Sequence, residues 1–281
     1  MRPGSAFGFV AAFLLSCLAL YVPGMALAQE VSSSWLPPQK EVFPLLWADP
    51  RSAQFSLQIY RVGGQTRSAD SIGHQIALWR LETGQGGTLQ LGLEAAAFLR
   101  LTLSTVGQNA ALTDTDWFFG FPIEYRQGPW AFRVWSFHTS SHLGDNYLIA
   151  HNVTPITYSR ETAEALLSYS FSQLMIYGGG SRAIHAIPDV DTWAAHAGFQ
   201  AWSKPLDAKG TTRLYAAADE QPKAQVDWQV QTNVEAGFSI KPERSDKTVR
   251  VYLNYSAGPS ATGQFFQTTR SYLAGGLAFD F

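Results

Sequence analysis

The sequence predicts an all-β protein, built as a single antiparallel transmembrane β-barrel of about twelve strands. Three observations support this prediction. The final segment, residues 271–281, alternates strictly, with Leu273, Leu277 and Phe281 on one side of an extended strand. Charged residues make up only 15% of the chain, whereas aromatic residues reach 14%. After the N-terminal region, no segment approaches the roughly eighteen consecutive apolar residues that a membrane-spanning helix needs, so helical spans are excluded.

The N-terminus has the features of a cleaved export signal covering residues 1–28. Arg2 precedes an apolar run over residues 7–21, which is too short for a comfortable helical span. Ala28 ends a small-residue segment that a signal peptidase accepts before Gln29. A lipoprotein attachment site at Cys17 is a less favoured alternative. In either case the mature chain has no disulfide chemistry within it, because Cys17 is the only cysteine.

The C-terminal strand resembles that of bacterial outer-membrane β-barrels, whose alternating apolar residues and terminal Phe are read by the barrel assembly machinery. Phe281 stands at this position. The resemblance implies an outer-membrane location in a Gram-negative bacterium. It also implies three partners: the assembly machinery, outer-membrane lipid and lipopolysaccharide.

Alternating segments of roughly ten residues recur along the chain and predict the individual strands. Residues 227–240 are the clearest example. One side carries Trp228, Val230, Thr232, Val234, Ala236, Phe238 and Ile240, and the other carries Asp227, Gln229, Gln231, Asn233 and Glu235. The first strand is predicted at 54–61, and less regular strands at 73–82 and 147–159. Ten or fourteen strands are the near alternatives to twelve.

The connections between strands form two classes, which predict the topology. The short ones are residues 83–87, 127–129, 159–162, 205–210 and 242–247. Residues 104–114 and 179–192 are longer or more irregular, and the glycines Gly178 to Gly180 lead into the second of these. Short turns are typical of the periplasmic rim and long loops of the outer surface, so an even strand count follows.

Residues 29–53 do not alternate and contain several prolines, so we expect a periplasmic strap or partial plug before a barrel over residues 54–281. Three motifs resemble a family of bacterial outer-membrane proteins catalogued only as a domain of unknown function. They are Phe43-Pro-Leu-Leu-Trp-Ala-Asp-Pro-Arg51, Phe121-Pro-Ile-Glu-Tyr125 and Ser140-Ser-His-Leu-Gly-Asp145. The resemblance covers nearly the whole mature chain and implies a barrel, but no activity.

Charged residues on the predicted inner side suggest an ionic network in the lumen. They are Glu94, Arg100, Arg133, Arg213, Asp219, Glu235 and Arg250. If these charges pair they fill the barrel, and if they stay hydrated they line a narrow channel. The formal charge of the chain is −2 and there is no basic cluster, so nucleic-acid binding has no support.

The strand predicted at 130–141 carries the residues that are candidates for catalysis. Arg133 is expected in the lumen, which places His138 and Ser140 on the outward side, two residues apart. This pattern resembles outer-membrane phospholipase A and, more distantly, lipid A deacylase, in which a partner Asn or Glu on the neighbouring strand orients the histidine. The resemblance implies an acyl hydrolase with Ser140 as nucleophile, His138 as base and Asn152 as the orienting residue.

Other interpretations of these residues remain open. Phospholipase A continues its motif with Asn and Gly, where this chain has Ser141 and His142. The same polar residues could form the end of a strand among lipopolysaccharide head groups. Asp145 could turn the hairpin or coordinate calcium, which is the one cofactor considered. Two classes of function therefore stand side by side: a lipid acyl hydrolase, and a non-enzymatic barrel that acts as a narrow pore or a structural protein. The oligomeric state is not predicted.

Overall fold

The computed structural model describes residues 31–281, except for positions 39, 104–109 and 246. The predicted signal peptide over residues 1–28 and most of the predicted loop over 104–114 lie outside the described residues. Within the part that is described, no helix is both long and apolar enough to cross a membrane.

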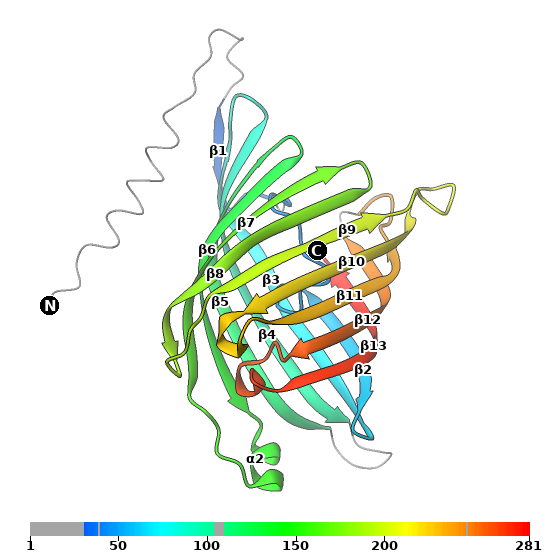
Figure 1. Cartoon of the computed structure of the whole chain (residues 1–281). Coiled ribbons are helices and arrows are strands. Elements are labelled where there is room, and N and C mark those ends of the chain that lie inside the picture. Colours follow the sequence, from blue (N-terminus) through cyan, green and yellow to red (C-terminus); the bar gives the residue numbers. More distant parts are fainter. Residues whose placement is uncertain (1–30, 39, 104–109, 246) are drawn as a thin grey trace, which may run out of the picture. The chain divides into compact units, whose positions relative to one another are not determined.

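The described residues form one antiparallel sheet in which β2 to β13 close into a twelve-stranded barrel (Figure 1). The barrel strands are β2 (Phe55–Val62), β3 (Gln65–Glu82), β4 (Gly87–Leu103), β5 (Ala111–Gln127), β6 (Trp130–Leu143), β7 (Tyr158–Phe171), β8 (Leu174–Ile187), β9 (Ala194–Trp202), β10 (Thr212–Lys223), β11 (Gln229–Ile240), β12 (Thr248–Pro259) and β13 (Thr269–Asp280). A further short strand, β1 (Ser32–Trp35), pairs with the C-terminal end of β3. Pairing of β13 with β2 closes the sheet, so the predicted fold class and strand number are confirmed.

The two ends of the barrel differ in their connections. One end, here called the turn end, carries the turns after β3, β5 and β7 together with Phe281. The opposite end, the loop end, carries three short helices between strands: α2 (Asp145–His151), η1 (Ala224–Val226) and η2 (Gly263–Phe265). Figure 1 shows α2 projecting from the loop end, with β1 at the other end.

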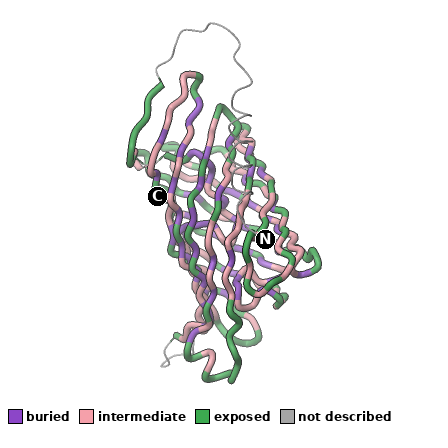
Figure 2. The backbone as a smooth tube through the Cα atoms, turned by 90° about the vertical axis from the view of Figure 1, so that its left-hand side faces the viewer, coloured by how far each residue is buried: buried purple, intermediate pink, exposed green. Residues whose placement is uncertain are grey.

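Buried and exposed residues alternate along the strands, as the sequence pattern requires (Figure 2). Large apolar side chains cover the outside, and they include Leu57, Ile76, Phe121, Phe132, Leu167, Phe199, Leu214, Val234, Phe238, Val251 and Leu253. The inside carries many polar residues beside smaller apolar clusters: Gln90, Glu94, Glu124, Asp219, Gln231, Asn233, Glu235 and Arg250 are all buried. Such a division suits an apolar surrounding outside and a hydrated or ion-paired lumen inside.

Two lumenal arginines, Arg250 and Arg133, each pair with two carboxylates. Arg250 donates to Glu235 on β11 at 2.6 Å and to Asp280 on β13 at 2.9 Å, and it also bonds the side chain of Gln54. Arg133 similarly contacts Glu124 at 2.7 Å and Glu94 at 3.3 Å. The guanidinium groups thus join neighbouring strands across the barrel wall, and desolvation of each charge is offset by a close partner.

A segment that precedes β2, residues 41–54, lies against the lumenal side chains and is here called the inner segment. Arg126 of β5 donates to the carbonyl of Val42 at 2.6 Å, and Arg51 pairs with Asp116 of β5 at 2.7 Å. The backbone N–H of Trp47 donates to Gln200 of β9 at 2.5 Å. Strands from both sides of the barrel therefore hold this segment.

The secondary structure predicted for residues 147–162 was wrong. The strand predicted at 147–159 is α2 followed by an extended segment, and β7 begins only at Tyr158. Residues 159–162, predicted as a turn, lie within β7, and the turn falls at Ser172, whose φ is 45°. The helix forms because Asp145 is in its first turn, His151 is in its last, and Asn152 takes the left-handed conformation that ends helices.

Gly178 to Gly180, predicted to enter a long loop, lie within β8 and pair with both β7 and β9. A Cβ atom at Gly179 would stand 1.9 Å from the carbonyl oxygen of Ala165. Glycine is therefore needed here for the close approach of two strands rather than for a flexible loop.

We expect Val251→Arg to lower the free energy of unfolding by about 2–4 kcal/mol, because Val251 is 50% exposed on the apolar outer face. Val251→Leu should have little effect, and Asn254→Ser on the inner face should cost less than about 1 kcal/mol. Urea unfolding in lipid vesicles measures all three. Equal sensitivity on the two faces would contradict this assignment of sides.

We expect Arg250→Met to cost about 3–5 kcal/mol, because it leaves the buried carboxylate of Glu235 and the partly buried carboxylate of Asp280 without their cation. Arg213→Met is the matched control, since Arg213 makes no ion pair within the described residues and should change stability by roughly 0.5 kcal/mol or less. The same unfolding measurement applies. A similar loss in both variants would show that the Arg250 pairs do not stabilise the barrel.

Candidate functional site

The outward face of β6 carries His138 and Ser140 near the loop end. Residues on the opposite face of β6, such as Arg133 and Thr139, line the lumen. Strand alternation therefore directs His138 and Ser140 outward, as the sequence predicted. In the register of β6 with β7, His138 is opposite Glu161 and Ser140 is opposite Ser159.

His138 is paired with a carboxylate on the neighbouring strand. Its Nδ1 atom lies 2.6 Å from Oε1 of Glu161, and the two side chains are 39% and 47% exposed, so both are accessible from outside the barrel. With Nδ1 held by Glu161, Nε2 is the ring nitrogen left to accept a proton. Within the described residues the Ser140 hydroxyl makes no hydrogen bond, and it is about 7 Å along the strand from His138.

Aromatic residues of β5 flank this pair. Trp117 lies opposite Ser140 and Phe119 lies opposite His138 in the register of β5 with β6. Both aromatic side chains are exposed on the outer face. Trp is enriched where apolar and aqueous regions of a membrane meet, so this surface suits the carbonyl level of a lipid layer.

Ser141, the residue next to Ser140, has a different role. Its hydroxyl donates to Asp116 inside the barrel and accepts the backbone N–H of Gln264 at 2.9 Å. Gly263 also donates to Asp116 at 3.0 Å. These contacts fix the loop containing η2 over the loop end. The adjacent residues Ser140 and Ser141 thus point to opposite faces of β6.

The structure does not bring the other two predicted site residues to this pair. Asn152 ends α2 and is exposed, rather than standing on the strand beside β6. Its predicted place beside His138 was therefore wrong, because residues 145–151 form a helix. Asp145 is in the first turn of α2, where a carboxylate stabilises the helix dipole. Within the described chain it belongs to no group of three His, Cys, Asp or Glu side chains close enough to share a metal ion.

Glu161 was missed because β7 was placed incorrectly. A signal was present in the sequence: Ala163, Ala165 and Leu167 alternate with Thr162, Glu164 and Leu166. Extending that pattern backwards places Glu161 on the outward face. Only the register with β6, however, identifies His138 as its partner.

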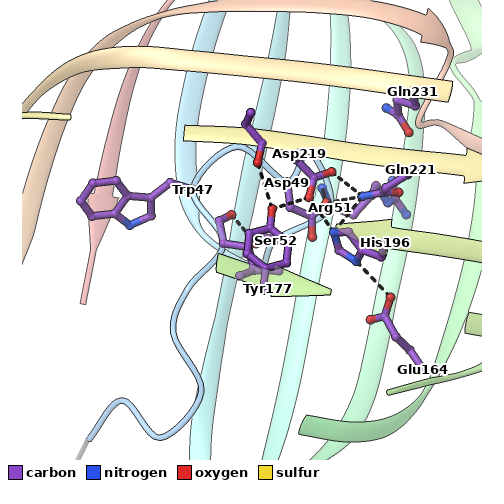
Figure 3. A network of polar contacts seen from close by, with 12 residues as sticks. Trp47, Asp49, Arg51, Ser52, Glu164, Tyr177, His196, Asp219, Gln221 and Gln231 are labelled. Carbon is purple, nitrogen blue, oxygen red and sulfur yellow. Dashed lines mark hydrogen bonds and ion pairs between the residues drawn. The ribbon is translucent and has the colours of Figure 1, made fainter. Parts of the chain in front are cut away.

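A second polar cluster lies inside the barrel and joins the inner segment to β7, β9 and β10 (Figure 3). His196 contacts Asp219 through Nε2 at 2.6 Å and Glu164 through Nδ1 at 3.2 Å. Gln221 donates to Asp49 at 3.1 Å and to Asp219 at 2.8 Å. Burial and the adjacent carboxylate of Asp219 raise the pKa of Asp49 to about 6, against the opposing effect of His196. Sequence reasoning included Asp219 in the lumen, but not its partners.

A cavity of about 950 Å³ borders this cluster. Its lining includes Asp49, Glu164 and His196, and it reaches the turn end at Lys247 and Phe281. The inner segment forms much of the same lining. The lumen is therefore a partly filled chamber rather than a smooth tube.

Comparisons with solved structures gave other β-barrels at low identity. The translocator domain of the autotransporter NalP from Neisseria meningitidis is 11% identical, with a TM-score of 0.36, and the match covers 81% of this chain and 85% of that chain. A triple mutant of the Rhodopseudomonas blastica porin is 11% identical, with a TM-score of 0.29, and the match covers 82% of this chain and 98% of that chain.

A search of curated proteins gave no match to this sequence. A family model matches residues 25–281 of the 281 residues. The chain therefore belongs to the family described as "Protein of unknown function (DUF1207)".

Proposed function

We propose that the protein is an outer-membrane barrel that hydrolyses acyl esters of membrane lipids. The observation that carries the proposal is the 2.6 Å contact between His138 and Glu161 on the outward face, two residues from Ser140. In the proposed orientation the apolar band faces the bilayer of a Gram-negative outer membrane, the turn end faces the periplasm, and the loop end lies among lipopolysaccharide. Phe281 then serves as the terminal aromatic that the assembly machinery engages.

The position of the pair supports a lipid substrate. Ser140 stands three residues before the end of β6, about 10 Å along the strand. At this depth the ester carbonyls of an outer-leaflet phospholipid or lipid A would reach the hydroxyl, while acyl chains lie along Phe119 and Phe121. A polar pair facing lipid is costly at the middle of a bilayer and much less so near the interface, so its place near the end of β6 is compatible with contact to ester groups at that level.

The proposed reaction is acyl transfer through a serine ester. The Ser140 hydroxyl attacks the ester carbonyl as Nε2 of His138 takes its proton, and the imidazolium then returns the proton to the departing alcohol. Water attacks the acyl-serine in the second step, which releases the fatty acid and restores the serine. Glu161 is the positioning residue: it holds the ring through Nδ1 and stabilises the imidazolium.

We expect the purified barrel in detergent to release fatty acid from phospholipid or lipid A. Ser140→Ala should lower kcat by at least roughly 10³-fold and His138→Ala by roughly 10²–10⁴-fold, because they remove the nucleophile and the base. Glu161→Gln should lower kcat by up to roughly 10⁴-fold with KM unchanged, and Glu161→Asp should recover part of it. Asn152→Ala and Ser141→Ala are the matched controls.

Calcium is supplied in one arm of this assay and chelated in another, so that an ion requirement cannot hide activity. Heat-modifiable migration in gels checks that each variant is folded. Unchanged hydrolysis in Ser140→Ala, or none in the wild-type protein in either arm, would favour the non-enzymatic alternative.

A non-enzymatic barrel is the second candidate. The inner segment bears on whether such a barrel is open or closed to ions. Residues 41–54 and the paired lumenal charges fill much of the barrel, so we propose that the segment acts as a plug. We expect wild-type protein in planar lipid bilayers to give little ion conductance, and deletion of residues 41–52 to raise it at least roughly tenfold. Glu161→Gln, on the outer face, should leave conductance unchanged. Large steady conductance in the wild-type protein would support an open pore instead.

A further inference from the structure

We propose that Asp49, His196 and Asp219 form a binding site for a divalent transition-metal ion of the zinc class inside the barrel. One ligand atom from each residue lies within 4.8 Å of the other two. All three side chains are almost completely buried, and they come from the inner segment, β9 and β10. The site is independent of the outward His138 pair.

The orientation of His196 is the main structural support. Its Nδ1 atom faces Glu164, and Glu164 is itself fixed by the indole N–H of Trp135, which donates at 2.7 Å. A histidine that binds metal through Nε2 commonly donates its other ring N–H to a carboxylate in this way. Glu164 therefore has the position of an outer-shell residue, and Nε2 points at Asp219 and Asp49.

The charge balance of the cluster also calls for a cation. Three carboxylates, those of Asp49, Glu164 and Asp219, surround one imidazole, and within the described residues neither of the nearby basic residues forms an ion pair with them. Arg51 pairs with Asp116 at 2.7 Å, and Lys223 donates to Gln231 at 2.6 Å. With a protonated His196 the three carboxylates keep two uncompensated negative charges, whereas a divalent ion beside a neutral His196 would leave one.

The ligand set determines the class of ion. One imidazole nitrogen and two carboxylate oxygens suit zinc, whereas calcium prefers six or more oxygen ligands. In a tetrahedral site the ligand atoms lie about 3.3 Å apart, so the His196 to Asp219 contact would lengthen by roughly 0.7 Å on binding. Three protein ligands leave a fourth position, and Asp49 and His196 both border the cavity of about 950 Å³. Water or a small ligand could occupy that position.

The test uses the full-length barrel, without a polyhistidine tag, refolded in detergent after chelation. Equilibrium dialysis against Zn²⁺ with elemental analysis should give one tightly bound ion per chain. His196→Gln and Asp219→Asn should each weaken binding at least roughly 100-fold, and Glu164→Gln by roughly 10–100-fold. Co²⁺ in place of Zn²⁺ should give the visible absorption of a tetrahedral site in the wild-type protein and not in His196→Gln.

His185→Gln is the matched control, because His185 is an exposed histidine outside the cluster, and it should bind zinc as the wild type does. Asp49→Asn tests the site without altering a barrel strand, in case a strand variant does not fold. The proposal is overturned if the wild-type protein binds no more zinc than His196→Gln or Asp49→Asn, or if His185→Gln loses as much.

Discussion

Closure of the sheet between β2 and β13 is the constraint on which the rest of this structure depends. In a bilayer every backbone N–H and C=O group must find a partner within the protein, and a closed antiparallel sheet satisfies this condition without leaving an edge. Once the sheet is closed, successive side chains must point alternately to lipid and to the lumen. The polar residues of twelve strands are thereby gathered into one narrow interior, where their charges need partners.

Arginine side chains and the inner segment provide partners for the charged groups in the lumen. Arg133 and Arg250 each bind two carboxylates and thereby link neighbouring strands. Residues 41–54 supply Arg51 to Asp116, Gln54 to Arg250, and Asp49 to the cluster around His196. The segment completes polar contacts that the barrel wall cannot complete by itself, so removing it would affect both the contents of the lumen and the stability of the wall.

The two proposed sites lie on opposite faces of the same barrel wall. On β7, Glu161 points outward to His138, while Glu164, three residues later, points inward to His196. A histidine and a carboxylate facing lipid favour chemistry on a lipid ester, and a histidine among buried carboxylates favours a metal ion. Neither site needs the other, and the experiments on each use variants that leave the other intact.

Alternation along the chain predicted the barrel, about twelve strands, the lumenal charges and the outward position of His138 and Ser140, because between bulges the direction of a side chain in a strand follows residue parity. Parity does not determine which strands are neighbours or in what register they pair. The helix at 145–151 shifted β7, so the sequence selected Asn152 where the structure brings Glu161 to His138. The contacts between Asp49, His196 and Asp219 join residues far apart in the chain, and only closure of the barrel around the inner segment brings them together.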